Sequence, residues 1–297
     1  MTVIAPGTPP EPAAETLVAP EDPAAALARY LHAERRRRLR RNTLDLGLFA
    51  AGLVLLVWAV VNGATAMGYN WQWYRVPQFF YREIDGEWYR GPLIRGLLVT
   101  LQITAWGMVL SLAIGLATAL LRLSRSYAGH ALATAYLELI RNTPLLVQMY
   151  LFYFVLSPIL GIDRFWTGVL ALAFFEASFI SEIIRGGILS VPRGQWEAAS
   201  SVGLKQAQVY RLVVLPQAVP LMLPPLTSSM VNLIKSSAIV STIAIFDLTN
   251  EGRNIIADTF MTFEVWLTVA AIYLVLTGSL STLAAWLERR ARRAQRR

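Results

Sequence analysis

Five long stretches without a single charged residue constrain this chain more than any other feature. They cover residues 46–74, 96–121, 142–162, 212–234 and 265–287. A bilayer core about 30 Å thick requires about 20 apolar residues per helix, and each stretch meets that length. A sixth stretch, 165–184, contains Glu176 and Glu182 but fills the only remaining gap long enough for a crossing. We therefore expect an all-α integral membrane bundle with six transmembrane helices.

The distribution of basic residues predicts the orientation of this bundle. The chain carries a net charge of +8, and 20 of its 27 basic residues fall in the two termini and in alternate connections between the spans. Cytoplasmic loops are enriched in Lys and Arg. The pattern places both termini in the cytoplasm, and it decides against nucleic-acid binding because the charges follow the spans instead of forming one patch.

Several kinds of chemistry are excluded by what the sequence lacks. There is no cysteine, which excludes disulfides, thiol catalysis and cysteine metal sites. His32 and His130 lie in polar segments and are interpreted as solvated residues, so we expect neither a metal site nor a catalytic group. No glycine is followed by Lys-Ser or Lys-Thr, so the chain has no phosphate-binding P-loop of its own.

The ends of the chain and its first outer connection differ from the apolar core. Residues 1–43 begin rich in Pro, Ala and Glu and finish in a basic run, and we expect a disordered tail. Residues 44–67 are too long for a signal peptide and should form an extra transmembrane helix. The aromatic-rich connection 68–90 indicates an interfacial segment, either a simple anchor or a surface for an external partner. Residues 289–297 form a second basic tail.

The connection 185–216 is longer than a turn requires and is itself patterned. Pro192 to Gly194 is a turn signal, residues 195–202 are good helix formers, and Gly203 suits a helix end with positive φ. The pattern predicts a short helix, a glycine corner and a second short helix. Glu197 and Ala198 near its tip could meet a partner, or the helix could lie on the membrane surface.

These residues resemble a known family. The spacing of Glu197-Ala198-Ala199, Gly203 and Leu215-Pro216 is similar to the EAA loop of ATP-binding-cassette (ABC) importer permeases, with Val213 where isoleucine is usual. Residues 138–148 and 181–197 resemble the branch that imports polar amino acids. The resemblance covers about residues 91–291, so we expect a permease domain at 91–288, and it leaves out the helix at 44–67.

The resemblance implies a type I permease fold in a bacterial cytoplasmic membrane. It implies that Glu197, Ala198 and Gly203 form a coupling helix and turn that dock on a cytoplasmic ATPase, with Ala199, Leu215 and Pro216 completing the motif. ATP would bind that partner, and this chain would hold no cofactor. The other implied partners are an external solute-binding protein and a second permease subunit, identical or homologous. The implied substrate is a polar L-amino acid such as glutamate, glutamine, aspartate or histidine.

A candidate translocation path follows from polar residues inside the spans, because such residues should face protein or water. Ser228, Asn232 and Lys235 share one face of the fifth helix, with Ser236 beside them. Lys235 could bind a substrate carboxylate, and Glu176 or Glu182 a substrate ammonium. Alternatively, Lys235 neutralises one of these glutamates, and Glu182 pairs with Arg185 at i, i+3.

Two further interpretations remain open at this point. Four prolines, Pro216, Pro220, Pro224 and Pro225, are expected at the start of the fifth helix, although a broken helix that lines a cavity is an alternative. A self-powered secondary transporter or channel is the alternative function. It would predict a repeat between the two halves of the chain, and none is visible. A membrane enzyme would need a nucleophile with a base, which the sequence does not offer.

Overall fold

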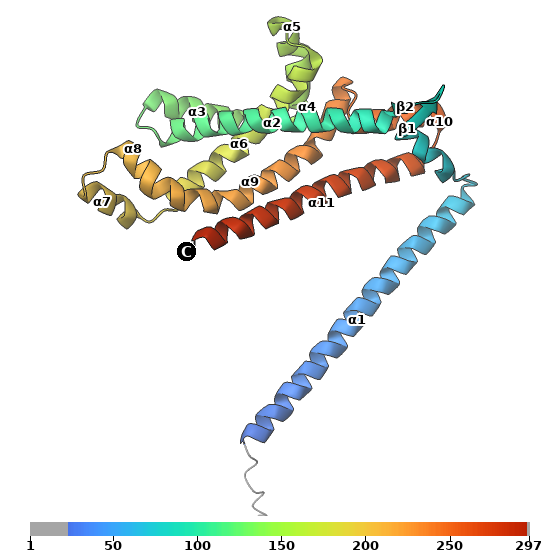
Figure 1. Cartoon of the computed structure of the whole chain (residues 1–297), viewed down its shortest axis with the longest axis horizontal. Coiled ribbons are helices and arrows are strands. Elements are labelled where there is room, and N and C mark those ends of the chain that lie inside the picture. The colour runs from blue at the N-terminus through green and yellow to red at the C-terminus, as the bar shows by residue number, and fades with distance from the viewer. Residues whose placement is uncertain (1–22, 296–297) are drawn as a thin grey trace, which may run out of the picture. The chain divides into compact units, whose positions relative to one another are not determined.

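The computed structural model describes residues 23–295, with side chains from 43 to 286 apart from Ala64. The chain divides into two units, Met1–Asn70 and Trp71–Arg297, and each is described by itself. The first unit contains one long helix, α1 (Pro23–Ala66), shown in blue in Figure 1. Its part Thr43–Gly63 is long and apolar enough to cross a membrane, as expected for the extra helix at 44–67.

Both chain ends are more helical than the sequence suggests. Residues 23–43 were expected to be disordered but continue α1, and α11 (Thr262–Gln295) continues through most of the basic tail 289–297. The reason is local, because both segments consist largely of Ala, Leu, Arg and Glu, which are strong helix formers. Residues 1–22 and 296–297 lie outside the described part of the chain.

Four long helices form the bundle of the second unit. These are α2 (Pro92–Leu123), α6 (Arg164–Leu189), α9 (Leu215–Ser237) and α11, which run side by side in Figure 1. Membrane-spanning candidates are found at Pro92–Leu123, Arg164–Leu189, Gln206–Ile243 and Thr262–Trp286. Together with α1, five of the six expected spans are therefore confirmed as continuous helices of sufficient length and apolarity.

The remaining span, expected at 142–162, is found only as the second half of a bent pair of helices. Helix α3 (Tyr127–Arg141) is followed by α4 (Leu145–Tyr150), a π-helical segment Leu151–Leu156 and α5 (Ser157–Leu160), with a bend of 106° between the two halves. The bend lies at Thr143-Pro144, where proline lacks a backbone donor and the residue before it avoids helical angles. The Gln148 amide stabilises the corner by donating to the carbonyl oxygens of Ile140 (2.7 Å) and Thr143 (3.0 Å).

The prolines of the fifth span lie within a helix and not only at its start. The helical run begins with α8 (Gln206–Val209) and a π-helical segment Tyr210–Val214, and α9 follows directly. Pro220, Pro224 and Pro225 are inside α9, while Pro216 follows the π-helical segment. The run continues to Ile243 without a break. Helix-start geometry therefore accounts only for Pro216, which lies in the first turn of α9. The π-helical segment before it has a wider turn, which accommodates a local interruption of the normal hydrogen-bond ladder.

Helix α6 lies at the centre of the bundle. Val169, Leu172 and Ile180 are fully buried, and α6 packs mainly against α2. Close contact is possible because Gly115 of α2 has no side chain. A Cβ atom there would lie 2.7 Å from Ile180 Cγ2 and 3.1 Å from the carbonyl oxygen of Ala177. Small residues at such contacts let membrane helices approach and gain dispersion energy.

The two ends of the bundle carry different structures. At one end lie α7 (Arg193–Ser201) and α8, and at the opposite end lie α10 (Leu248–Thr259) and a hairpin of β1 (Tyr81–Ile84) and β2 (Glu87–Arg90) (Figure 1). Tyr81 pairs with Arg90, and the turn is Asp85-Gly86, both with positive φ. This hairpin was not predicted, although Asp-Gly between paired strands is a strong turn signal.

A short 3-10 helix, Trp73–Phe79, precedes the hairpin and is attached to the start of α11. The backbone N–H of Gln72 donates to Glu264 Oε1 at 2.6 Å, and the Trp71 ring lies 5.7 Å from that of Phe263. Gly91 then leads into α2, with its N–H donating to the Phe80 carbonyl at 2.7 Å. These contacts hold the interfacial segment against the end of the bundle.

Candidate coupling loop and translocation cavity

The loop after α6 has the expected order of short helix, glycine corner and second helix. Helix α7 starts after Pro192, and Gly203 follows it with φ +80°, a left-handed conformation that favours glycine. The Gly203 N–H donates to Ser200 O at 3.0 Å and the Leu204 N–H to Ala199 O at 3.3 Å. These bonds satisfy carbonyl groups at the end of α7 and turn the chain back toward the bundle.

The residues of the Glu-Ala-Ala motif divide between two faces of α7. Glu197 and Ala198 are exposed, whereas Ala199 is buried. On the buried side, Trp196 packs edge-on against Tyr210 with ring centroids 5.2 Å apart, and its indole N–H donates to Val191 O at 3.3 Å. The helix therefore presents a carboxylate and a small residue outward while its inner face is fixed.

Leu215 and Pro216, the other motif residues, lie away from this outer face. They begin α9 and are exposed, directly before Gln217, whose side chain reaches Gln195 at 3.4 Å. This weak contact connects α9 with α7, in addition to the covalent connection through the residues between them.

The six polar residues predicted for the path surround one cavity. The cavity has a volume of about 830 Å³ and lies between α6 and α9, with the end of α3 beside it. Glu176 is buried, and Ser229 of α9 supplies a hydrogen bond to its carboxyl group. The lining includes all six predicted residues, Glu176, Glu182, Ser228, Asn232, Lys235 and Ser236, and also Arg141, Phe175, Phe179, Ile183, Pro225 and Ser229.

Glu182 is held by arginines. Its carboxylate binds Arg185 at 2.8 Å, as expected from the i, i+3 spacing, and also accepts a hydrogen bond from Arg122 of α2. Arg141 of α3 approaches to 3.7 Å, donates to the Ser178 carbonyl at 2.7 Å and lies over the Phe179 ring. The predicted path did not include Arg141, because only the bend at Pro144 brings the end of α3 against α6.

In the described part of the chain, Lys235 forms an ion pair with neither Glu176 nor Glu182. Within the described residues its ammonium forms no ion pair, and the Glu182 carboxylate is already occupied by guanidiniums. Lys235 is exposed to the cavity space, whereas Glu176 is buried in its wall. The cavity therefore offers a free ammonium group and a separate carboxyl group within one polar space.

A bundle of membrane-length helices with an open polar cavity between them and an exposed helix at one end is what the membrane subunit of a transporter requires. Residues 111–293 match the family described as "Binding-protein-dependent transport system inner membrane component". The chain belongs to this family and is the permease subunit of an ABC importer. This assignment decides against a self-powered transporter or channel.

Named relatives and solved structures agree with this assignment. The chain is 36% identical to the glutamine transport system permease protein GlnP of Escherichia coli K12, over 67% of this chain and 92% of the relative. It is 35% identical to the octopine transport system permease protein OccM of Rhizobium radiobacter, over 68% and 89%. A crystal structure of an amino acid ABC transporter with histidines matches with TM-score 0.63 and 40% identity, over 67% and 94%. The MetNI methionine transporter, at 22% identity and TM-score 0.60, shares the fold.

Proposed function

We propose that this permease moves a polar L-amino acid, such as glutamate, glutamine, aspartate or histidine, into the cytoplasm. The observation that carries the proposal is the cavity between α6 and α9, in which an unpaired Lys235 and the buried Glu176 line the same space. An amino acid carries a carboxylate and an ammonium group, so this pair offers one partner of opposite charge to each. The names of the relatives and of the similar structure support the same substrate class.

Energy would come from another chain. In this proposal α7 docks through Glu197 and Ala198 on a cytoplasmic ATPase that binds and hydrolyses ATP, and this chain contributes neither a catalytic residue nor a cofactor. The exposed outer face of α7 and the glycine corner at Gly203 support this role. An extracytoplasmic solute-binding protein would deliver the substrate, and a second permease subunit would complete the pathway. Both termini would then lie in the cytoplasm, on the side of α7.

The proposal is tested by ATP-dependent uptake. The chain is co-expressed with candidate ATPase and binding-protein partners, and accumulation of labelled amino acids is measured in the same membranes for the wild type and for Glu197→Lys. We expect uptake to require the ATPase and to be lost in Glu197→Lys. The control Glu138→Lys reverses another exposed carboxylate, on α3, and should retain uptake. Uptake that is indifferent both to the ATPase and to Glu197→Lys would overturn the proposal.

A further inference from the structure

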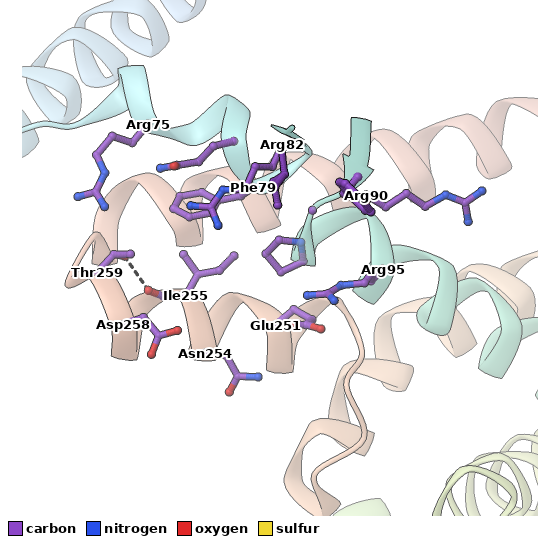
Figure 2. Close-up of a pocket in the computed structure, with 15 residues that line it drawn as sticks. Arg75, Phe79, Arg82, Arg90, Arg95, Glu251, Asn254, Ile255, Asp258 and Thr259 are labelled. Atoms are coloured by element: carbon purple, nitrogen blue, oxygen red, sulfur yellow. Dashed lines mark hydrogen bonds between the residues drawn. The ribbon is translucent and has the colours of Figure 1, made fainter. Parts of the chain in front are cut away.

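A second polar pocket lies at the end of the bundle opposite α7. Its volume is about 530 Å³, and it is formed by the 3-10 helix, the hairpin, the start of α2 and α10. Figure 2 shows the side chains of the hairpin and the 3-10 helix on one side and those of α10 on the other. Phe79, Pro92 and Ile255 contribute apolar lining. Four arginines line the pocket, Arg75, Arg82, Arg90 and Arg95, together with Glu251 and Asp258.

The pocket carries an excess of positive charge. Four guanidiniums face two carboxylates, and no ion pair joins any of the six to another residue in the described part of the chain. Arg75 donates to the neutral amide of Gln72 at 2.7 Å, so its charge is not compensated. Burial raises the pKa of Glu251, and the neighbouring Arg95 opposes that shift. The arginines are therefore available to an external anion.

The position of the pocket indicates which anion can reach it. Pro92 begins one membrane span and Thr259 lies just before another, which starts at Thr262, so the pocket lies where helices leave the hydrocarbon. The adjoining hairpin exposes aromatic rings, with Trp88 69% and Tyr89 50% accessible. Exposed Trp and Tyr side chains are typical of the headgroup level of a bilayer. Anionic headgroups are concentrated at this level, beside apolar surface that can accommodate the start of an acyl chain.

We propose that this arginine pocket binds the phosphate headgroup of an anionic phospholipid, such as phosphatidylglycerol, in the leaflet on the side opposite α7. Guanidinium groups bind phosphate oxygens through paired, charge-assisted hydrogen bonds. Arg82 and Arg95 approach the centre of the pocket from the hairpin and from α2 (Figure 2). The lipid would thus link the hairpin to the bundle, a role independent of which amino acid is transported.

The test uses the full-length chain, purified and delipidated in a neutral detergent. Short-chain phosphatidylglycerol and phosphatidylcholine with the same acyl chains are titrated, and bound lipid is measured by native mass spectrometry. We expect the wild type to prefer phosphatidylglycerol. The double variant Arg82→Gln/Arg95→Gln should weaken that binding at least about tenfold, the effect of losing one or more charge-assisted hydrogen bonds. Arg253→Gln removes an exposed arginine of α10 outside the pocket and should bind as the wild type does.

Each contrary outcome would overturn the proposal. The first is a wild type that binds phosphatidylglycerol and phosphatidylcholine equally. The second is a double variant that binds phosphatidylglycerol as tightly as the wild type does. Glycerol 3-phosphate is added as a competitor. If it occupies the pocket as tightly as the lipid, the ligand is a soluble anion. If lipid binding is absent but the double variant loses binding of an acidic extracytoplasmic protein, the surface is a protein docking site. If the double variant does not fold, Arg82→Lys is tested instead. It keeps the charge but not the paired hydrogen bonds, and it should weaken phosphatidylglycerol binding less than the double variant is expected to.

Discussion

The Glu182 carboxylate of α6 accepts a hydrogen bond from the Arg122 guanidinium of α2, across 60 positions of sequence. The same carboxylate binds Arg185 at 2.8 Å and lies 3.7 Å from Arg141 of α3. These four side chains are between 20% and 33% exposed, so water and salt screen them less than surface charges. One acid therefore holds three cations from three helices beside the cavity.

Replacing this acid should destabilise the bundle. Glu182→Gln leaves three neighbouring guanidiniums without a negative partner, and we expect a loss of about 1–3 kcal/mol in the free energy of unfolding. Thermal unfolding of the purified chain in detergent measures the effect. Glu138→Gln, at an exposed position on α3, is the control and should leave Tm almost unchanged. Equal Tm values for the two variants would show that the cluster adds no stability.

Uptake should be more sensitive to substitution of Gly203, at the glycine corner, than to substitution of Gly194 in α7. An added Cβ has open space at both Gly203 and Gly194, but only Gly203 has a positive φ, +80°. Gly203→Ala therefore introduces about 1–2 kcal/mol of backbone strain without a steric clash. We expect ATP-dependent uptake to fall several-fold in Gly203→Ala and to be retained in Gly194→Ala. If both variants transport equally well, the corner does not set the position of α7.

Asp247 should make stability depend on pH. Its carboxylate is buried and caps α10 by accepting the backbone N–H groups of Thr249 and Asn250. Burial raises the pKa of Asp247 from 3.8 to about 6, and the hydrogen bonds from the backbone oppose the shift. The folded state then binds the proton more tightly than the unfolded state. The contribution to stability is complete below pH 3.8 and is lost as the pH rises to about 6.

Thermal unfolding between pH 4 and pH 7 tests this dependence. Asp247→Asn keeps a side-chain oxygen that can cap α10 but does not titrate, so its Tm should vary less with pH than that of the wild type. Asp163→Asn is the matched control, because Asp163 caps α6 with the same two-bond pattern but is exposed. If the slope for Asp247→Asn equals that of the wild type, another group causes the dependence.

Lys235 should be required for transport but not for assembly. Its ammonium lines the cavity and forms no ion pair among the described residues, so Lys235→Met removes no internal partner. We expect this variant to insert and to bind its ATPase normally while uptake is lost. Lys235→Arg keeps the positive charge and should retain part of the uptake. Normal uptake by Lys235→Met would remove this residue from the path.

Much of the architecture could be predicted from local pattern. Four of the five charge-free stretches located continuous membrane-length helices, because backbone groups in hydrocarbon must be satisfied within each segment. The pattern of residues 192–203 predicted the short helix and the glycine corner at Gly203, because a helix start and a left-handed corner have local requirements. Periodicity placed Ser228, Asn232 and Lys235 on one face of α9, where they share one cavity.

Other features depended on contacts between distant segments. The i, i+3 spacing predicted that Glu182 pairs with Arg185, but not that Arg122 and Arg141 would join them, because helix packing and the bend at Pro144 bring these residues together. The same arrangement leaves Lys235 without an ion pair among the described residues, since arginines already bind Glu182. Local sequence thus determined which segments are helices and which faces are polar. Tertiary structure decided which charges neutralise one another, because an ion pair depends on distance in space and not on separation in sequence.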